Sequence, residues 1–248
     1  MKKLILIITL IITVGSVSAN LVGHWNFNGN LNNDLSGKSP MVLQGSSSIS
    51  YQTDTIAGSS ANVCSFPAFP GGYTDYIGMP NESGLSICTN YTLVYDIKYP
   101  TLSSYTCMLD FGYETGDGDF FEHQNGIGVG GVYAGTFNAD TWYRIALAAY
   151  YDSDNDNVIW SKYIDGSLVG TQVLTYARYS IYNELRLFVD NDGETAAGLV
   201  NSFAFYDNTL SDSEIASMGA ASASGIPIPE PISVFFILTA LLGFFVRK

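Results

Sequence analysis

Short apolar runs separated by glycine-, asparagine- and aspartate-rich turns fill the sequence between residues 20 and 228. Leu93, Tyr95 and Ile97 illustrate these runs, because they recur at the spacing of two that places side chains on one face of a β-strand. Strands this short and this frequent must pair with one another to satisfy their backbone groups. We expect strands at 21–27, 91–99, 142–150, 158–164, 185–189 and 199–206.

Two local signals mark the ends of elements. Ser211 and Glu214 have the spacing of a capping box, and Gly219 suits a helix end, so one short helix is predicted at 211–218. Asp165-Gly166 lies between two expected strands and predicts a tight hairpin turn. Many strands with one brief helix predict an all-β fold, an antiparallel sandwich.

Residues 1–19 have the three parts of a secretory signal peptide. Two lysines precede an apolar run, and the small residues Val17-Ser18-Ala19 form a cleavage site. An uncleaved anchor is the alternative, but the run is short for a membrane span of about 20 residues. We therefore expect a signal helix that is cut between Ala19 and Asn20.

The C-terminal end carries a second address. A small-residue linker is expected at 220–228, followed by Pro229-Glu230-Pro231, the apolar run 232–246 and the basic end Arg247-Lys248. As a helix this run would be about 22 Å long, short of the ~30 Å hydrocarbon core of a bilayer. The alternative to a processed segment is an ordinary transmembrane tail anchor.

Residues 229–248 resemble the PEP-CTERM sorting signal of Gram-negative bacteria, which combines these three features. In that family a membrane enzyme, the exosortase, removes the tail and releases the body. The resemblance implies an exosortase-type partner and an inner-membrane intermediate held by the hydrophobic C-terminal helix. It also implies final delivery to the cell surface or the extracellular matrix.

The body resembles laminin-G-like domains, which belong to the concanavalin A-like jelly rolls. The similar segments, in the family's order, are 21–37, 142–146, 163–170 and 187–215. The resemblance covers a domain at 20–219. It implies a two-sheet antiparallel jelly-roll sandwich with about six or seven strands in each sheet, and with the first and last strands adjacent.

The charge of the body limits its partners. Residues 20–228 hold 22 acidic and 6 basic side chains, a balance of −16. Nucleic-acid binding needs basic surface that displaces phosphate counterions, so that class of partner is excluded. Other anionic partners would require a bridging cation.

Two acidic loops have the alternating oxygen ligands of calcium sites. The first, Asp152, Asp154 and Asp156, lacks the glycine and glutamate of helix-loop-helix calcium sites and also fits an ordinary hairpin loop. The second comprises Asp190, Asp192 and Glu194, and its alternative is a turn at Gly193. Laminin-G-like modules often carry calcium at a sheet rim, which favours the second loop.

Aromatic side chains in glycine-rich stretches are candidates for stacking on sugar rings. We expect Tyr73, Tyr76, Tyr113 and Tyr133 to be ligand-binding residues, because rings in such loops are more exposed than rings on strands. The alternative for each is a loop residue that covers an edge of the core.

Catalytic patterns are missing. The Glu-x-Asp-x-Glu string, which points two carboxylates of a sandwich glucanase into one cleft, does not occur. The nearest acidic cluster runs from Glu114 to Glu122 with the wrong spacing, and His24 is expected to make a structural polar contact. We therefore expect a protein that is not an enzyme.

Three cysteines, Cys64, Cys88 and Cys107, predict one disulfide and one free thiol in an oxidising compartment. Three pairings are possible, and the sequence does not choose among them.

These observations predict an exported, non-catalytic surface or matrix module that binds polysaccharide. The alternatives are a structural or adhesive domain with a surface-protein partner and no sugar site, and a glycoside hydrolase that uses Glu114 or Glu122.

Overall fold

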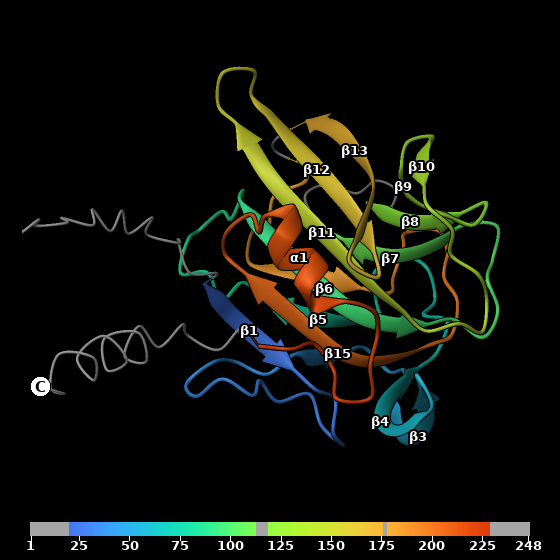
Figure 1. The fold of residues 1–248 in the computed structure, drawn as a ribbon. Coiled ribbons are helices and arrows are strands. Elements are labelled where there is room, and N and C mark those ends of the chain that lie inside the picture. Colours follow the sequence, from blue (N-terminus) through green and yellow to red (C-terminus); the bar gives the residue numbers. More distant parts are fainter. Residues whose placement is uncertain (1–19, 113–118, 176–177, 229–248) are drawn as a thin grey trace, which may run out of the picture. The chain divides into compact units, whose positions relative to one another are not determined.

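Two antiparallel sheets face each other in the computed structural model, which describes residues 20–112, 119–175 and 178–228 (Figure 1). The predicted jelly-roll sandwich is confirmed. The predicted signal helix and the hydrophobic C-terminal helix, with Pro229, Glu230, Pro231, Arg247 and Lys248, lie outside the described residues. Within those three described ranges, no helix combines the length and the apolar character needed to cross a membrane.

The eight-stranded sheet holds the long strands that the sequence pattern predicts. Its spatial order is β13 (Ser167–Thr175), β12 (Asn157–Ile164), β11 (Tyr143–Asp152), β6 (Tyr91–Lys98), β15 (Gly198–Tyr206), β4 (Ser59–Phe66) and β3 (Ser50–Ile56), and β1 (Leu21–Trp25) also pairs with β15.

The seven-stranded sheet is built from shorter strands. Its order is β10 (Val132–Ala134), β9 (Gly126–Val129), β8 (Phe120–His123), β7 (Thr106–Asp110), β14 (Glu184–Leu187), β5 (Tyr76–Pro80) and β2 (Val42–Gln44).

The first and last strands are adjacent, as expected. β15 pairs with β6 along one edge, and its other edge is shared by two strands. Residues 198–200 of β15 pair with β4, and residues 203–206 pair with β1. The first strand of the chain, β1, and the last, β15, are therefore neighbours in the eight-stranded sheet.

Large aromatic side chains fill the space between the sheets. Phe120 of β8 and Trp160 of β12 bring the two sheets together, with ring centroids 5.7 Å apart. The indole Nε1 of Trp160 donates to the Tyr91 hydroxyl at 2.9 Å, and that hydroxyl donates to the Tyr179 carbonyl at 2.8 Å. The core therefore gains large apolar burial without leaving these polar groups unsatisfied.

The predicted local signals are confirmed. Ser211 caps α1 (Asp212–Met218), and the reciprocal contact with Glu214 completes the capping box. Asp165 and Gly166, with φ of 50° and 78°, form the turn between β12 and β13. α1 covers the outer face of the eight-stranded sheet (Figure 1), and its buried residues are Ile215 and Met218.

Residues 220–228, expected as a linker, pack on the sandwich instead. The Arg144 guanidinium pairs with Asp96 through two bonds of 2.7 and 2.8 Å, and it also donates to the Met218 carbonyl and, at 2.8 Å, to the Gly225 carbonyl. Ile226 is 3% exposed. Residues 20–228 form one compact unit.

The predicted disulfide is wrong, because all three cysteines are free and buried. Cys64 lies on β4 of the eight-stranded sheet and Cys107 lies on β7 of the other sheet. Cys88 lies outside both sheets, where its backbone forms an isolated antiparallel β-bridge with Ile181. Burial raises the pKa of the Cys64 thiol to about 12 and that of Cys88 to about 11. These thiols are therefore protonated and unreactive at neutral pH.

Candidate functional site

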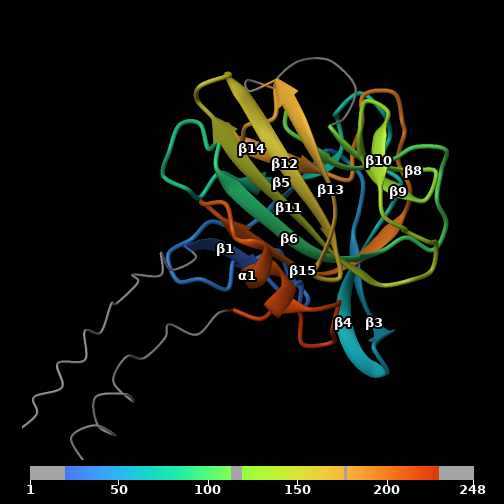
Figure 2. The same cartoon turned by 45° about the horizontal axis from the view of Figure 1, so that its top comes forward.

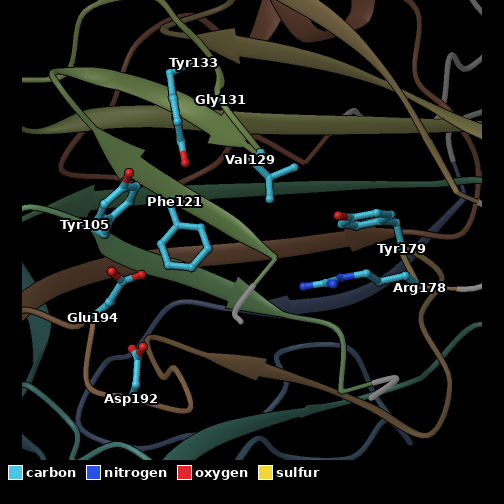
Figure 3. Close-up of a pocket in the computed structure, with 10 residues that line it drawn as sticks. Tyr105, Phe121, Val129, Gly131, Tyr133, Arg178, Tyr179, Asp192 and Glu194 are labelled. Atoms are coloured by element: carbon cyan, nitrogen blue, oxygen red, sulfur yellow. The ribbon is translucent and has the colours of Figure 1, made fainter. Parts of the chain in front are cut away.

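A cleft of about 490 Å³ lies against one end of the seven-stranded sheet (Figure 3). Its volume is within the range of small-molecule sites, about 300–1,000 Å³. The lining residues come from strands β8 to β10, from the β9–β10 turn and from three further loops: Tyr105, Phe121, Val129, Gly130, Gly131, Tyr133, Arg178, Tyr179, Asp192 and Glu194.

Three aromatic side chains, Tyr105, Phe121 and Tyr133, line one side of the cleft, and His123 packs against two of them. We call these four residues the aromatic wall. The Tyr105 ring stacks on the His123 ring at 3.7 Å and meets Phe121 edge-on at 6.1 Å. His123 and Tyr133 are 4.9 Å apart. Figure 3 shows Tyr105, Phe121 and Tyr133 gathered together. Because these rings brace one another, the wall is formed in advance of any ligand.

Strand alternation aims Phe121 at the cleft. Its neighbour Phe120 contacts Trp160 in the core, so Phe121 points the other way. Gly128 of β9 is in register with Phe121 on one side and Tyr133 on the other. A Cβ at Gly128 would lie 2.0 Å from the Val132 carbonyl oxygen, so only glycine permits this close hairpin.

Arg178 and Tyr179 stand on the other side of the cleft (Figure 3). The Nε of Arg178 donates to the Asp119 carboxylate at 2.6 Å, and Asp119 also accepts from the Phe111 amide at 2.9 Å. Burial raises the pKa of Asp119, while Arg178 opposes the shift. Arg178 is thus held in place by a buried partner.

The predicted acidic cluster at the sheet rim is brought together. One oxygen each of Asp190, Asp192 and Glu194 can be chosen so that all lie within 4.8 Å of one another. Asp190 is fully buried and accepts from the Asp192 amide at 3.1 Å, which shapes the turn. Carboxylate oxygens are the ligands that calcium prefers, so the donor set fits this ion.

More negative charge lies near this loop. Asp110 is 2% exposed, and burial together with the charge of Asp119 raises its pKa to about 7. The charge of Asp190 also raises the pKa of Asp119. Arg186 counters part of this field, with 3.3 Å between its Nη1 and Asp110. The local excess of carboxylates favours a cation in this region.

The other acidic loop is a hairpin loop between β11 and β12. Asp152 accepts from the Asp154 amide at 3.1 Å and from Asn155 at 2.8 Å, and Asp156 accepts from the Tyr151 hydroxyl at 2.9 Å. In the part of the chain that the structure describes, the three carboxylates at 190–194 are the one group gathered as a metal site would require.

The four predicted tyrosines separate in the fold. Tyr133 lines the cleft. Tyr73 and Tyr76 instead flank Arg186, whose guanidinium carbon lies 4.7 and 5.6 Å from their ring centroids, and the Tyr76 hydroxyl donates to Glu184 at 2.7 Å. Tyr113 lies outside the described residues.

Sequence reasoning missed the rest of the cleft. Four lining residues, Tyr105, Phe121, Arg178 and Tyr179, were not predicted as site residues, and neither was His123, which packs against Tyr105. The alternation of Phe121 and His123 on one short strand was an available signal. Nothing local, however, relates that strand to Tyr105 or Tyr179.

Of the two glutamates considered for catalysis, only Glu122 belongs to the described residues, and it does not line the cleft. Glu122 alternates with Phe121 along β8, is 2% exposed, and accepts from the Asn125 amide at 2.8 Å. Glu114 lies outside the described residues. His24 is buried, with its Nδ1 3.0 Å from an Asp34 carboxylate oxygen, in the structural contact that we expected.

No protein-family model matches the chain, and no curated protein matches it. Solved structures do share its fold. Domain 4 of AbnA, a GH43 extracellular arabinanase from Geobacillus stearothermophilus, solved in complex with arabinotriose, is 17% identical, with a TM-score of 0.56 over 80% of this chain and 98% of that domain.

Two further structures are similar over 80% of this chain, each with a TM-score of 0.52. The binding domain of botulinum neurotoxin serotype G is 13% identical, and a Trypanosoma rangeli sialidase bound to 2,3-difluorosialic acid is 14% identical. This chain spans 50% of the toxin domain and 32% of the sialidase. At these identities the similarity shows a shared β-sandwich fold.

Proposed function

We propose that this chain is an exported, non-catalytic module of the cell surface or extracellular matrix, and that it binds polysaccharide in the cleft of Figure 3. The observation that carries the proposal is the preformed aromatic wall beside polar groups. Apolar faces of sugar rings stack on aromatic side chains, while carboxylates and amides fix the hydroxyl groups. The arabinotriose-bound domain has the same fold, which supports this reading.

The charge distribution favours a neutral polymer. Five of the six basic side chains at 20–228 are in ion pairs, and the sixth, Lys162, donates to a backbone carbonyl. An acidic polysaccharide would therefore meet a body of charge −16 with its cations already engaged.

We include calcium in the proposal. Asp190, Asp192 and Glu194 would supply part of the six to eight oxygen ligands that the ion takes, and Asp192 and Glu194 also line the cleft. A bound ion would neutralise the local carboxylates and would offer further coordination positions to sugar hydroxyls.

Binding to an array of immobilised polysaccharides, with and without EDTA, tests the function. Tyr133→Ala should weaken binding about ten-fold or more, because the loss of one stacked ring from a binding site costs about 1.4 kcal/mol or more. Tyr150→Ala is the matched control, since Tyr150 is 54% exposed on the other sheet. No binding to any polysaccharide, or equal losses in the two variants, would refute the ligand assignment.

Export and sorting form the second part of the proposal. Cleavage between Ala19 and Asn20, and exosortase processing near Pro229–Pro231, would leave every element of the compact unit 20–228 intact. Mass spectrometry of the mature protein should find both new ends. An intact Lys248 would contradict sorting.

Two alternatives predict other outcomes. An adhesive domain without a sugar site would bind a surface protein and no polysaccharide on the array. A glycoside hydrolase would release reducing ends, and Glu122→Gln would abolish that release. The buried position of Glu122 on the face opposite Phe121 is the observation against the hydrolase.

A further inference from the structure

A second, smaller cleft lies on the eight-stranded sheet. It measures about 280 Å³ and forms where the loop after β1 meets the β3–β4 hairpin. Among the residues that the structure describes, no charged side chain lines this cleft, whereas three line the aromatic cleft. Its lining residues are Asn28, Gly29, Tyr51, Gln52, Thr53 and Asn62.

The topology explains why a cleft opens here. Along one edge of β15, β4 pairs with residues 198–200 and β1 pairs with residues 203–206. The ends of β4 and β1 are therefore separated at residues 201 and 202 of β15. The β3–β4 hairpin continues outward from this junction and projects from the body in both orientations (Figures 1 and 2). The cleft is therefore built into the way the sheet closes.

Strand register places three lining side chains on one face. Thr53 is opposite Asn62, and Tyr51 is opposite Cys64, so Tyr51, Thr53 and Asn62 point the same way. Tyr51 packs against the core and is half-buried, while Thr53 and Asn62 are exposed. The result is an aromatic ring fixed beside a hydroxyl and an amide.

Asn201 lies at the junction itself and is 4% exposed. Its Nδ2 donates to the Asn62 carbonyl at 2.9 Å, while its buried Oδ1 accepts no hydrogen bond in the described structure. Buried acceptors without a donor are rare and costly. The bond from Asn201 fixes the backbone of Asn62, which lines the cleft.

We propose that this cleft is a second ligand site, for one neutral sugar unit of a polysaccharide. Amides and hydroxyls both donate and accept, as sugar hydroxyls require, and the Tyr51 ring offers an apolar face. The absence of lining charge selects against uronic acids and amino sugars. The site goes beyond the proposed function, because it makes the chain bivalent and able to bridge two polymer segments.

Side-chain amide signals in ¹H–¹⁵N NMR spectra provide a direct test. The full-length chain would be studied in dodecylphosphocholine micelles, whose head group is not a sugar. D-glucose, D-galactose, D-mannose and L-arabinose would be added separately, each to 200 mM. We expect at least one sugar to shift the amide signals of Asn28, Gln52 and Asn62 in a saturable way.

Variants then assign the site. Thr53→Val/Asn62→Leu should raise the Kd for that sugar at least ten-fold, and so should Asn28→Leu from the separate loop. Thr55→Val/Ser60→Val is the matched control, because this exposed pair lies opposite each other further along the same hairpin. It should leave the Kd unchanged.

One further variant shows whether sugar binding at this cleft is independent of binding at the aromatic cleft of the proposed function. Tyr133→Ala, which removes part of the aromatic wall, should leave the shifts of Asn28 and Asn62 in place. The inference is overturned if none of the four sugars shifts these signals, or if the shifts are unchanged in the Thr53→Val/Asn62→Leu and Asn28→Leu proteins.

Discussion

Lys162 should make the stability of the body depend on pH in an unusual direction. The side chain leaves β12, has no exposed surface, and donates to the Val132 carbonyl at 2.7 Å and to Gln172 at 3.3 Å. Gln172 in turn donates to the Val129 carbonyl at 2.9 Å. Together they hold both ends of the β9–β10 turn, which carries Tyr133 into the cleft.

Burial lowers the pKa of Lys162 from 10.5 to about 8. The unfolded chain keeps this proton up to about pH 10.5, while the folded chain loses it near pH 8. Between these values the unfolded state binds more protons, so stability rises with pH. A fall in the pKa from 10.5 to about 8 corresponds to about 3 kcal/mol, since a tenfold change in proton affinity is worth about 1.4 kcal/mol.

Urea unfolding of residues 20–228, followed by tryptophan fluorescence at pH 7 and pH 10.5, measures this effect. Lys162→Met removes the titrating group and keeps most of the volume. The free energy of unfolding of the natural protein should gain about 3 kcal/mol more than that of the variant over this interval. The comparison cancels the tyrosines and cysteines that titrate in both proteins. Equal pH dependence in the two proteins would refute the reasoning.

Three other perturbations test the sandwich and its charges. Arg144→Met leaves the buried Asp96 carboxylate unpaired and should cost about 3–5 kcal/mol in urea unfolding; a loss below about 1 kcal/mol would show that the pair is dispensable. Gly166→Ala forces φ of 78° on a residue with a Cβ, 3.2 Å from Ala216, and should lower the stability by about 1 kcal/mol or more, visible as a lower Tm. Asp110→Asn should flatten the pH profile of Tm between pH 4 and 7: the folded state holds the Asp110 proton up to about pH 7, so the natural protein loses stability as pH rises through this window. An unchanged profile would contradict the raised pKa.

Local sequence was enough to predict elements whose physics is local. The period of two in 91–99 placed β6, and the capping box at Ser211 placed α1 within a residue. The Asp165-Gly166 turn was predicted for the same reason, since few residue pairs adopt two positive φ angles. Each of these features depends on neighbours along the chain.

The sites depend on strand order and register, which no local pattern encodes. The cleft combines side chains from separate elements: Tyr105, Phe121, Tyr133 and Tyr179. They line one cleft only because each of the strands β7 to β10 pairs with the next, and because the loop at 178–179 lies beside these strands. The same long-range arrangement places Cys64 and Cys107 on different sheets and Cys88 outside both, and no two of the three cysteines form the expected disulfide.

The segment 220–228 makes the same point. Its small residues are typical of a linker, yet it packs on the body because the Arg144 guanidinium, some 80 residues earlier, donates to the Gly225 carbonyl. Alternation along the chain determined which face of each strand is apolar. Long-range pairing then decided which strands became neighbours. That choice of neighbours also determined where the cleft, the buried charges and the acidic cluster of Asp190, Asp192 and Glu194 lie.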